Sequence, residues 1–128
     1  MISKLQRIKF SGKLIFVGFG CIGQGVLSLL LRHLDIAPAQ ISIITDNESG
    51  RLEADHYQIP FNVCPLTASN YKTILGSFLD PGDFLLNVSI NVSSAALIAF
   101  CHKQEVLYLD CCIEPWAGGY NGYSFVTF

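Results

Sequence analysis

Short apolar runs alternate with longer amphipathic runs along the 128 residues of the chain. Each apolar run has the length of one buried strand, and most of them stop at Gly, Pro or Asp, which commonly end strands. The runs predict strands over residues 14–19, 41–45, 61–64, 84–88 and 106–109. Strands that alternate with helices are typical of a parallel sheet with right-handed crossovers, so we expect an α/β fold.

The segment at residues 23–34 has the period of an amphipathic helix. Gln24, Ser28 and Arg32 recur every four residues and predict a polar stripe on its outer surface. Five apolar residues are expected on its inner face: Val26, Leu27, Leu30, Leu31 and Leu34. Pro38 follows at a place typical of a residue beyond a helix end.

Three further helices are expected between the later strands. Residues 48–57 are mostly polar and predict a short helix. Thr67 or Ser69 is expected to cap the helix before the fourth strand, and Asn91 or Ser93 the helix before the fifth.

Composition narrows the class of protein. Hydrophobic residues make up 51% of the chain and charged residues 14%, which excludes a disordered chain. Such a low charge is typical of strands buried on both faces, or of a surface that a neighbouring domain covers. The net charge is −2 and the eight Lys and Arg residues are scattered, so we expect no nucleic-acid partner. Residues 84–101 carry no charge, but Asn and Ser interrupt this run, so a strand, a turn and a helix explain it without a membrane.

The five cysteines show no spacing of metal ligands or of a disulfide framework. We therefore expect free, mostly buried thiols in a reducing cytoplasm. The three histidines are also far apart, and no metal site is predicted. Residues 1–13 lack the apolar core of a signal peptide, which agrees with a cytoplasmic location.

The motif GFGCIG has the spacing G-x-G-x-x-G, directly after a predicted strand and at the start of a predicted helix. In this setting Gly18 permits a tight turn, Gly20 lets the backbone approach a pyrophosphate, and Gly23 lets the helix pack closely on the strand. The N–H groups and the positive dipole end around Cys21 and Ile22 are expected to face the phosphates. The motif therefore predicts a dinucleotide site in a Rossmann-type doubly wound parallel sheet of about five strands, an incomplete version of the full unit.

An acidic residue stands where this fold binds the adenosine ribose. Asp46 ends the second predicted strand, 23 residues after Gly23. A carboxylate at this point accepts both ribose hydroxyls and repels a 2′-phosphate, which favours NAD over NADP. Taken alone, Asp46 is more simply a turn residue, and Arg51 offers a partner for a 2′-phosphate, so NADP stays open.

Polar residues follow the last two predicted strands, at the edge of the sheet where ligands bind in this fold. Asn87 and Ser89 are expected near a nicotinamide, although turn or cap chemistry also explains Ser89 and its neighbour Asn91. Glu114 and Trp116 follow the fifth strand, and a carboxylate beside an indole suits an ammonium group. A loop with one packed aromatic side chain is the alternative.

Three segments together resemble a known family. They are IFVGFGCIGQGVLSLLLRH, LLNVSINVSS and LYLDCCIEPWAGGY, and they resemble the N-terminal, NAD-binding part of bacterial homospermidine synthase, within the saccharopine dehydrogenase-like NAD(P)-binding proteins. The resemblance runs over about residues 10–120. It implies an enzyme that takes hydride from putrescine with NAD, transfers the aminobutyl group to a second putrescine with loss of ammonia, and reduces the resulting imine to homospermidine.

The resemblance also implies roles for single residues. The glycine loop holds the pyrophosphate and Asp46 the ribose. Asn87 and Ser89 lie beside the nicotinamide, where Asn87 takes part in catalysis. Glu114 binds an amine end of the substrate as a catalytic residue, and Trp116 matches the same motif as a substrate contact. For full-length members the resemblance implies a homodimer.

The chain departs from this family in two ways. Family members are several times longer, with a further domain that closes the substrate pocket, and residues 121–128 (NGYSFVTF) diverge from the family's continuation. We therefore expect one NAD-binding domain over residues 1–128 that is truncated and inactive alone. An NAD-sensing module without catalysis and a non-functional truncated gene product are the alternatives.

Overall fold

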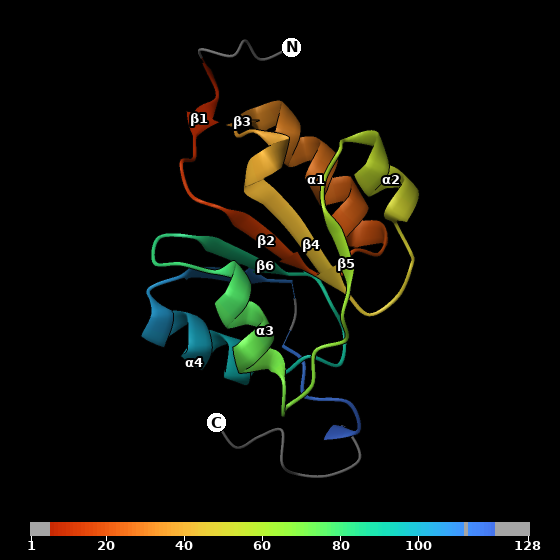
Figure 1. Ribbon diagram of the computed structural model, residues 1–128, viewed down its shortest axis with the longest axis vertical. Helices are drawn as coiled ribbons and strands as arrows, with labels where there is room; N and C mark the ends of the chain where they lie inside the picture. The colour runs from red at the N-terminus through yellow and green to blue at the C-terminus, as the bar shows by residue number, and fades with distance from the viewer. Residues whose placement is uncertain (1–5, 112, 120–128) are drawn as a thin grey trace.

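The computed structural model describes residues 6–111 and 113–119. A five-stranded sheet with parallel pairing throughout forms its centre (Figure 1). The strands are β2 (Leu14–Val17), β4 (Ile41–Thr45), β5 (Phe61–Val63), β6 (Phe84–Asn87) and β7 (Leu107–Asp110). Their order across the sheet is β5-β4-β2-β6-β7, so the chain builds outwards from β2 on one side and then on the other. The predicted Rossmann-like α/β fold is confirmed.

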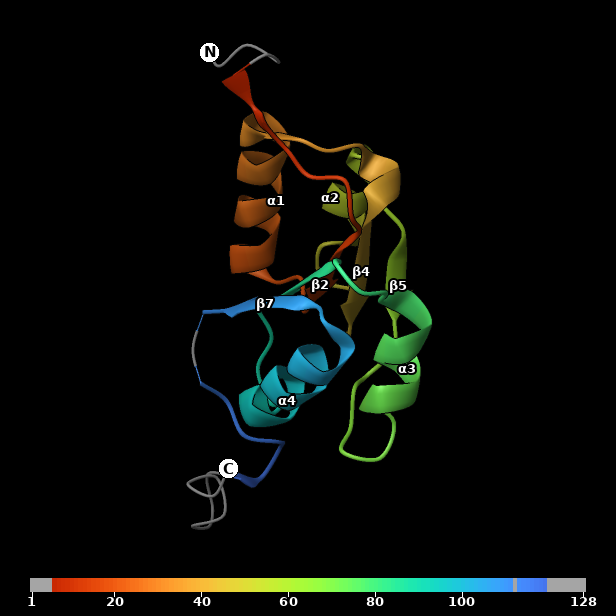
Figure 2. The same ribbon diagram turned by 90° about the vertical axis from the view of Figure 1, so that its left-hand side faces the viewer.

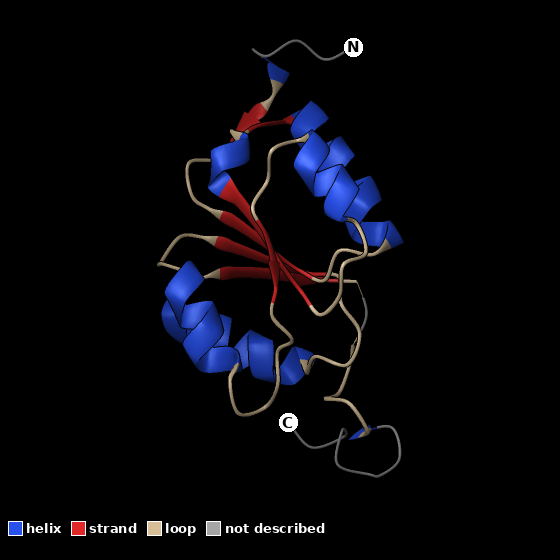
Figure 3. Cartoon of the chain, turned by 45° about the vertical axis from the view of Figure 1, so that its right-hand side comes forward, coloured by secondary structure: helices blue, strands red, loops and turns tan. Residues whose placement is uncertain are grey.

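Helices cover both faces of the sheet (Figure 3). Helices α1 (Cys21–His33) and α2 (Arg51–His56) pack on one face, whereas α3 (Tyr71–Phe78) and α4 (Ser94–Gln104) pack on the other. Side chains alternate along β2, so Phe16 joins the core under α1 and Val17 joins the core under α3 and α4. Both residues are at most 2% exposed, as strands buried on two faces require.

The predicted helix caps are partly right. Ser93 caps α4, because its hydroxyl accepts the N–H of Ala96 at 3.1 Å. The prediction of Thr67 or Ser69 as the cap of α3 is wrong, because that helix begins at Tyr71 and Asn70 occupies the cap position. The Asn70 side chain instead accepts the Thr67 N–H at 2.7 Å, which closes the preceding turn.

The surface of α1 differs from the expected polar stripe. Gln24 is half-buried and donates from Nε2 to the carbonyl oxygen of Phe19 at 3.2 Å, which ties the helix to the loop before it. Leu27 is buried as predicted, but Ile22 and Leu29 are 59% and 52% exposed. The outer face of α1 is therefore partly apolar.

A second, two-stranded parallel pair lies beside the main sheet and was not predicted. It joins β1 (Ile8–Lys9) to β3 (Leu34–Asp35), and the 3-10 helix η2 (Pro38–Gln40) follows. Strands of two residues carry no period that a sequence pattern can reveal. Leu34, expected on the inner face of the helix, belongs to β3.

The amino ends of β2 and β6 are held together by a buried carboxylate. Asp83 accepts the N–H of Lys13 at 2.8 Å and the N–H of Asp80 at 2.7 Å. Lys13 Nζ lies 2.9 Å from Asp80 and 3.4 Å from Asp83, and the hydrogen bond with Asp80 raises the pKa of Lys13. These contacts fix the register that places Val17 beside Asn87 at the other end of the two strands.

Strand β7 forms the edge of the sheet beyond β6 (Figure 2). Leu107 and Leu109 point to the face that carries α1 and are 54% and 55% exposed. The low charge of the chain therefore has the first of the two expected sources, strands buried on two faces, and β7 presents apolar surface on one face. Within the described residues, no helix combines the length and apolar character needed to cross a membrane.

Candidate functional site

A cleft of about 440 Å³ opens at the carboxyl ends of β2, β4 and β6. The strands pair in parallel, so the loops that follow them meet at one edge of the sheet. Four segments and two single residues line the cleft: residues 17–20, 44–47, 64–66 and 88–92, with Ser49 and Ala117.

The glycine turn after β2 forms the floor of the cleft. Gly18 has φ of +84°, a conformation that residues with a side chain rarely adopt, and its N–H donates to the Ile44 carbonyl at 2.8 Å. A Cβ on Gly18 would lie 2.7–2.9 Å from the backbone and Cβ atoms of Ser89, so the turn requires glycine for space as well. The two strand ends approach each other as closely as a backbone without a side chain permits.

Helix α1 starts directly after this turn with its N-terminus toward the cleft. Gly20 takes the cap position, no side chain caps the helix, and its first turn contains no acidic residue. The first N–H groups of a helix lack partners within the helix, so those of Cys21 and Ile22 are available to an anion. A Cβ on Gly20 would meet nothing within 4 Å, and a ligand can therefore approach the backbone here. This geometry fits a pyrophosphate.

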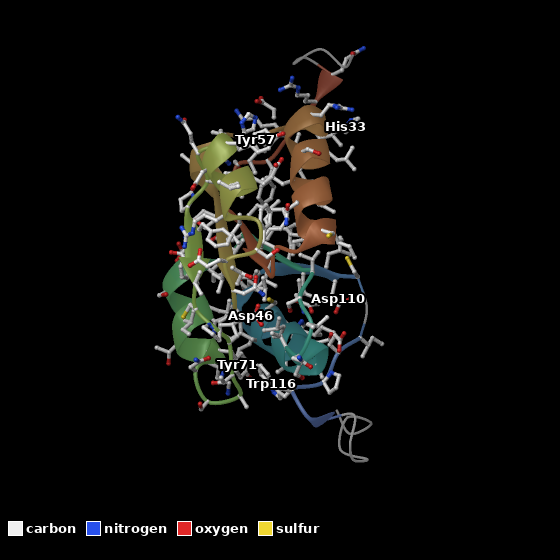
Figure 4. The ribbon with its side chains drawn as sticks, turned by 90° about the vertical axis from the view of Figure 1, so that its right-hand side faces the viewer. His33, Asp46, Tyr57, Tyr71, Asp110 and Trp116 are labelled. Atoms are coloured by element: carbon white, nitrogen blue, oxygen red, sulfur yellow. The ribbon has the colours of Figure 1, made fainter. Side chains whose placement is uncertain are left out.

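Asp46 lies in the same cleft, after β4. Figure 4 shows it near the middle of the molecule, between His33 and Tyr57 on one side and Tyr71 and Trp116 on the other. Its Oδ1 accepts from Asn47 Nδ2 at 2.8 Å, and Asn47 Oδ1 accepts the Ser49 N–H at 2.8 Å, so a small network holds the loop. The predicted ribose ligand and the predicted pyrophosphate turn thus line one cleft.

Arg51, the residue that left NADP open, is engaged elsewhere. Its guanidinium pairs with Glu48 and lies 4.6 Å from the centre of the Phe61 ring. The hydrogen bond between Arg51 and Glu48 raises the pKa of Arg51 and lowers that of Glu48. Neither Arg51 nor Glu48 lines the cleft.

Asn87 and Ser89 take different positions at the end of β6. Ser89 lines the cleft, whereas Asn87 is 2% exposed and lies below it. Asn87 Oδ1 accepts from both the N–H and the hydroxyl of Ser89. Asn91, with φ of +62°, also lines the cleft and does not cap α4.

Glu114 and Trp116 lie in the loop after β7 and do not line the cleft, although their neighbour Ala117 does. The N–H of Glu114 donates to the Ser94 hydroxyl at 2.9 Å, and the Ser94 N–H donates to the Glu114 carbonyl at 2.8 Å. The Trp116 ring packs on Tyr71 with ring centres 5.3 Å apart (Figure 4). This packing agrees with the alternative to an ammonium site, a loop with one packed aromatic side chain.

Comparisons with known proteins identify the family of the chain. Residues 14–121 match the model of the saccharopine dehydrogenase NADP binding domain, which is most of the chain. The chain belongs to this family. The predicted resemblance to bacterial homospermidine synthase is also confirmed by three similar proteins.

Homospermidine synthases of Mesorhizobium japonicum and Blastochloris viridis are 33% and 30% identical to the chain over 115 residues, which is 88% of the chain and 24% of each relative. The crystal structure of homospermidine synthase from Legionella pneumophila in complex with NAD superimposes with a TM-score of 0.88 at 36% identity, over 94% of the chain and 26% of that protein. The chain thus spans about a quarter of the length of these relatives.

The cysteines of this saccharopine dehydrogenase-like domain differ in exposure. Cys21 and Cys111 are exposed and Cys64 is half-buried, whereas burial raises the pKa of Cys101 to about 11. The expectation of mostly buried thiols is therefore wrong for two of these four. Cys112 lies outside the described residues. No three His, Cys, Asp or Glu residues in the described part of the chain gather as a metal site.

Two features of the site were not predicted. The segment at residues 64–66 forms one wall of the cleft, but its only sequence signal is the end of a strand. Tyr108 lies on the opposite face of β7 from Leu107 and Leu109, and its hydroxyl bonds both Asn87 and Asp110. The alternation of side chains along β7 places Tyr108 and Asp110 on one face, but does not show that this face, and not that of the two leucines, is the covered one.

Gly18→Ala should destabilise the domain by about 2–4 kcal/mol, because both the positive φ and the contact with Ser89 exclude a side chain. Gly25→Ala is the matched control, since a Cβ there meets nothing within 4 Å and alanine favours the helix by about 1 kcal/mol. Thermal and urea unfolding of both variants measure the difference. Equal stability of Gly18→Ala and the wild type would show that the turn is not constrained as described.

Proposed function

We propose that this chain binds NAD as the nucleotide-binding part of a homospermidine synthase. The observation that carries the proposal is the single cleft that contains both the glycine turn and the Asp46 carboxylate. The fit of the cleft to NAD rests on the open space above Gly20 and on the uncapped helix N-terminus beside it. A similar protein, 36% identical, crystallised in complex with NAD, which supports the same ligand.

The cleft favours NAD over NADP, although the family takes its name from NADP. Asp46 is exposed beside the expected ribose, where its charge disfavours a 2′-phosphate. Arg51 pairs with Glu48, stacks on Phe61 and does not line the cleft, which supports the same preference.

The residues of this chain then have distinct roles. The N–H groups of Cys21 and Ile22 bind the pyrophosphate, Asp46 orients the adenosine ribose, and Ser89 borders the space on the other side of the turn. When bound, NAD supplies the hydride acceptor that oxidation of an amine needs. Glu114, which the resemblance assigns to an amine end of putrescine, is held by its backbone to the start of α4.

Conversion of putrescine requires more than these residues. The relatives that carry the name of the enzyme are about four times as long as the segment they share with this chain. We therefore propose that putrescine turnover depends on groups beyond this domain. A cytoplasmic location and a homodimer stay predictions.

Calorimetry on the folded chain tests NAD binding. We expect saturable binding by the wild type and at least a tenfold weaker affinity for Gly20→Ala, since the added methyl group occupies the path of the pyrophosphate while contacting nothing in the protein. Gly25→Ala, five residues further along the chain and within α1, should bind as the wild type does. No heat at millimolar NAD, or unchanged affinity in Gly20→Ala, would contradict the proposal.

Incubation of the purified chain with NAD and putrescine tests the second part. Mass spectrometry should detect no homospermidine above the level of a control without protein, because the resemblance assigns closure of the substrate pocket to a further domain. Homospermidine formed in proportion to the amount of chain would show that this domain suffices for the reaction.

A further inference from the structure

The hydroxyl group of Tyr108 is the centre of a partly buried hydrogen-bond network between β6, β7 and α4. It accepts from Asn87 Nδ2 at 3.1 Å and donates to Asp110 Oδ2 at 2.9 Å, and it also hydrogen-bonds the Ser94 side chain. Burial raises the pKa of Tyr108, so the hydroxyl keeps its proton across the physiological range. A hydroxyl has one proton to donate, and here it goes to the carboxylate.

This arrangement fixes the orientation of the Asn87 amide. With the Tyr108 proton directed to Asp110, the hydroxyl oxygen can only accept from Asn87, so Nδ2 must face Tyr108 and Oδ1 must face Ser89. Oδ1 then receives both the N–H and the hydroxyl of Ser89. Asn87 is 2% exposed, and water is therefore a poor substitute for these partners.

The network ends at the cleft on one side and at the loop after β7 on the other. Ser89 packs directly on Gly18, so the Asn87 amide holds the wall that faces the glycine turn. Ser94 is 1% exposed and bonds the backbone of Glu114 in both directions. One phenol thus joins the two segments that carry the candidate cofactor and substrate residues.

The position of Ser89 indicates which part of a dinucleotide it meets. Asp46 follows β4, on one side of the central turn, and Ser89 follows β6, on the other. With the adenosine over β4 and the pyrophosphate at the turn, the nicotinamide half extends over β6.

We propose that Tyr108 is a positioning residue that shapes the nicotinamide half of the cleft through Asn87 and Ser89. The inference rests on the proposed binding of NAD. ADP contains the adenosine and pyrophosphate of NAD and lacks the nicotinamide half, so the two ligands separate the effects at the two ends.

Calorimetry with NAD and ADP on Tyr108→Phe tests the proposal. We expect the affinity for NAD to fall about fivefold to tenfold, the size of one lost buried hydrogen bond, while the affinity for ADP changes less than twofold. Tyr57→Phe is the matched control, because Tyr57 packs on the other face of the sheet, under α1 and α2. It should leave both affinities unchanged.

The outcomes separate this inference from the proposed function. If the wild type binds neither ligand, the proposed function fails and the inference with it. If the wild type binds both and Tyr108→Phe weakens both equally or neither, the inference alone is overturned. Should Tyr108→Phe fail to fold by circular dichroism, Asn87→Asp provides the second test, because it removes the donor to Tyr108 and should lower the affinity for NAD selectively. If neither variant folds, Tyr108 acts only on stability and the inference is wrong.

Discussion

The close approach of Gly18 to the Ser89 backbone is the contact on which the site depends. It brings the end of β2 against the end of β6 with no side chain between them. The Gly18 N–H reaches the Ile44 carbonyl on the other side, so the turn is anchored to β4 as well. Three strand ends converge at one glycine, and the cleft opens where the chain leaves them. The buried Asp83 carboxylate at the far ends of β2 and β6 maintains the register that this contact requires.

The electrostatic character of the cleft changes from one side to the other. Its centre presents the N-terminus of α1, with a positive dipole end and no acidic side chain in the first turn. One side presents the Asp46 carboxylate, and the other presents the hydroxyl of Ser89, backed by the neutral amide of Asn87. The proposed ligand, NAD, fits this order through its ribose hydroxyls and its phosphates, and a similar protein of known structure is in complex with NAD.

The strands and the glycine turn could be predicted from the sequence because the signals for them are local. The apolar runs end within two residues of the strands in the structure, and the glycine spacing fixes the turn that follows β2. The position of Asp46 in the cleft follows from its place directly after a predicted strand. Features that depend on contacts between distant segments were missed. Tyr108 gains its role from the register of β7 against β6, which places it beside Asn87, 21 residues earlier. The packing of Trp116, in the loop after β7, on Tyr71 of α3 is another such contact, and the predicted contact of Trp116 with an amine stays a prediction. Pairing of two-residue strands, as in β1 and β3, leaves no pattern at all.

A titration of the ¹⁵N-labelled chain with NAD, followed by NMR of the backbone amides, tests the central claim most directly. The account predicts that the largest shifts fall on residues 18–23, with further shifts at Asp46 and Ser89. The chemical shifts of amides in the groove between α3 and α4, lined by Lys72 and Lys103, should not change. Shifts that concentrate in that groove, or a spectrum unchanged at saturating NAD, would contradict it.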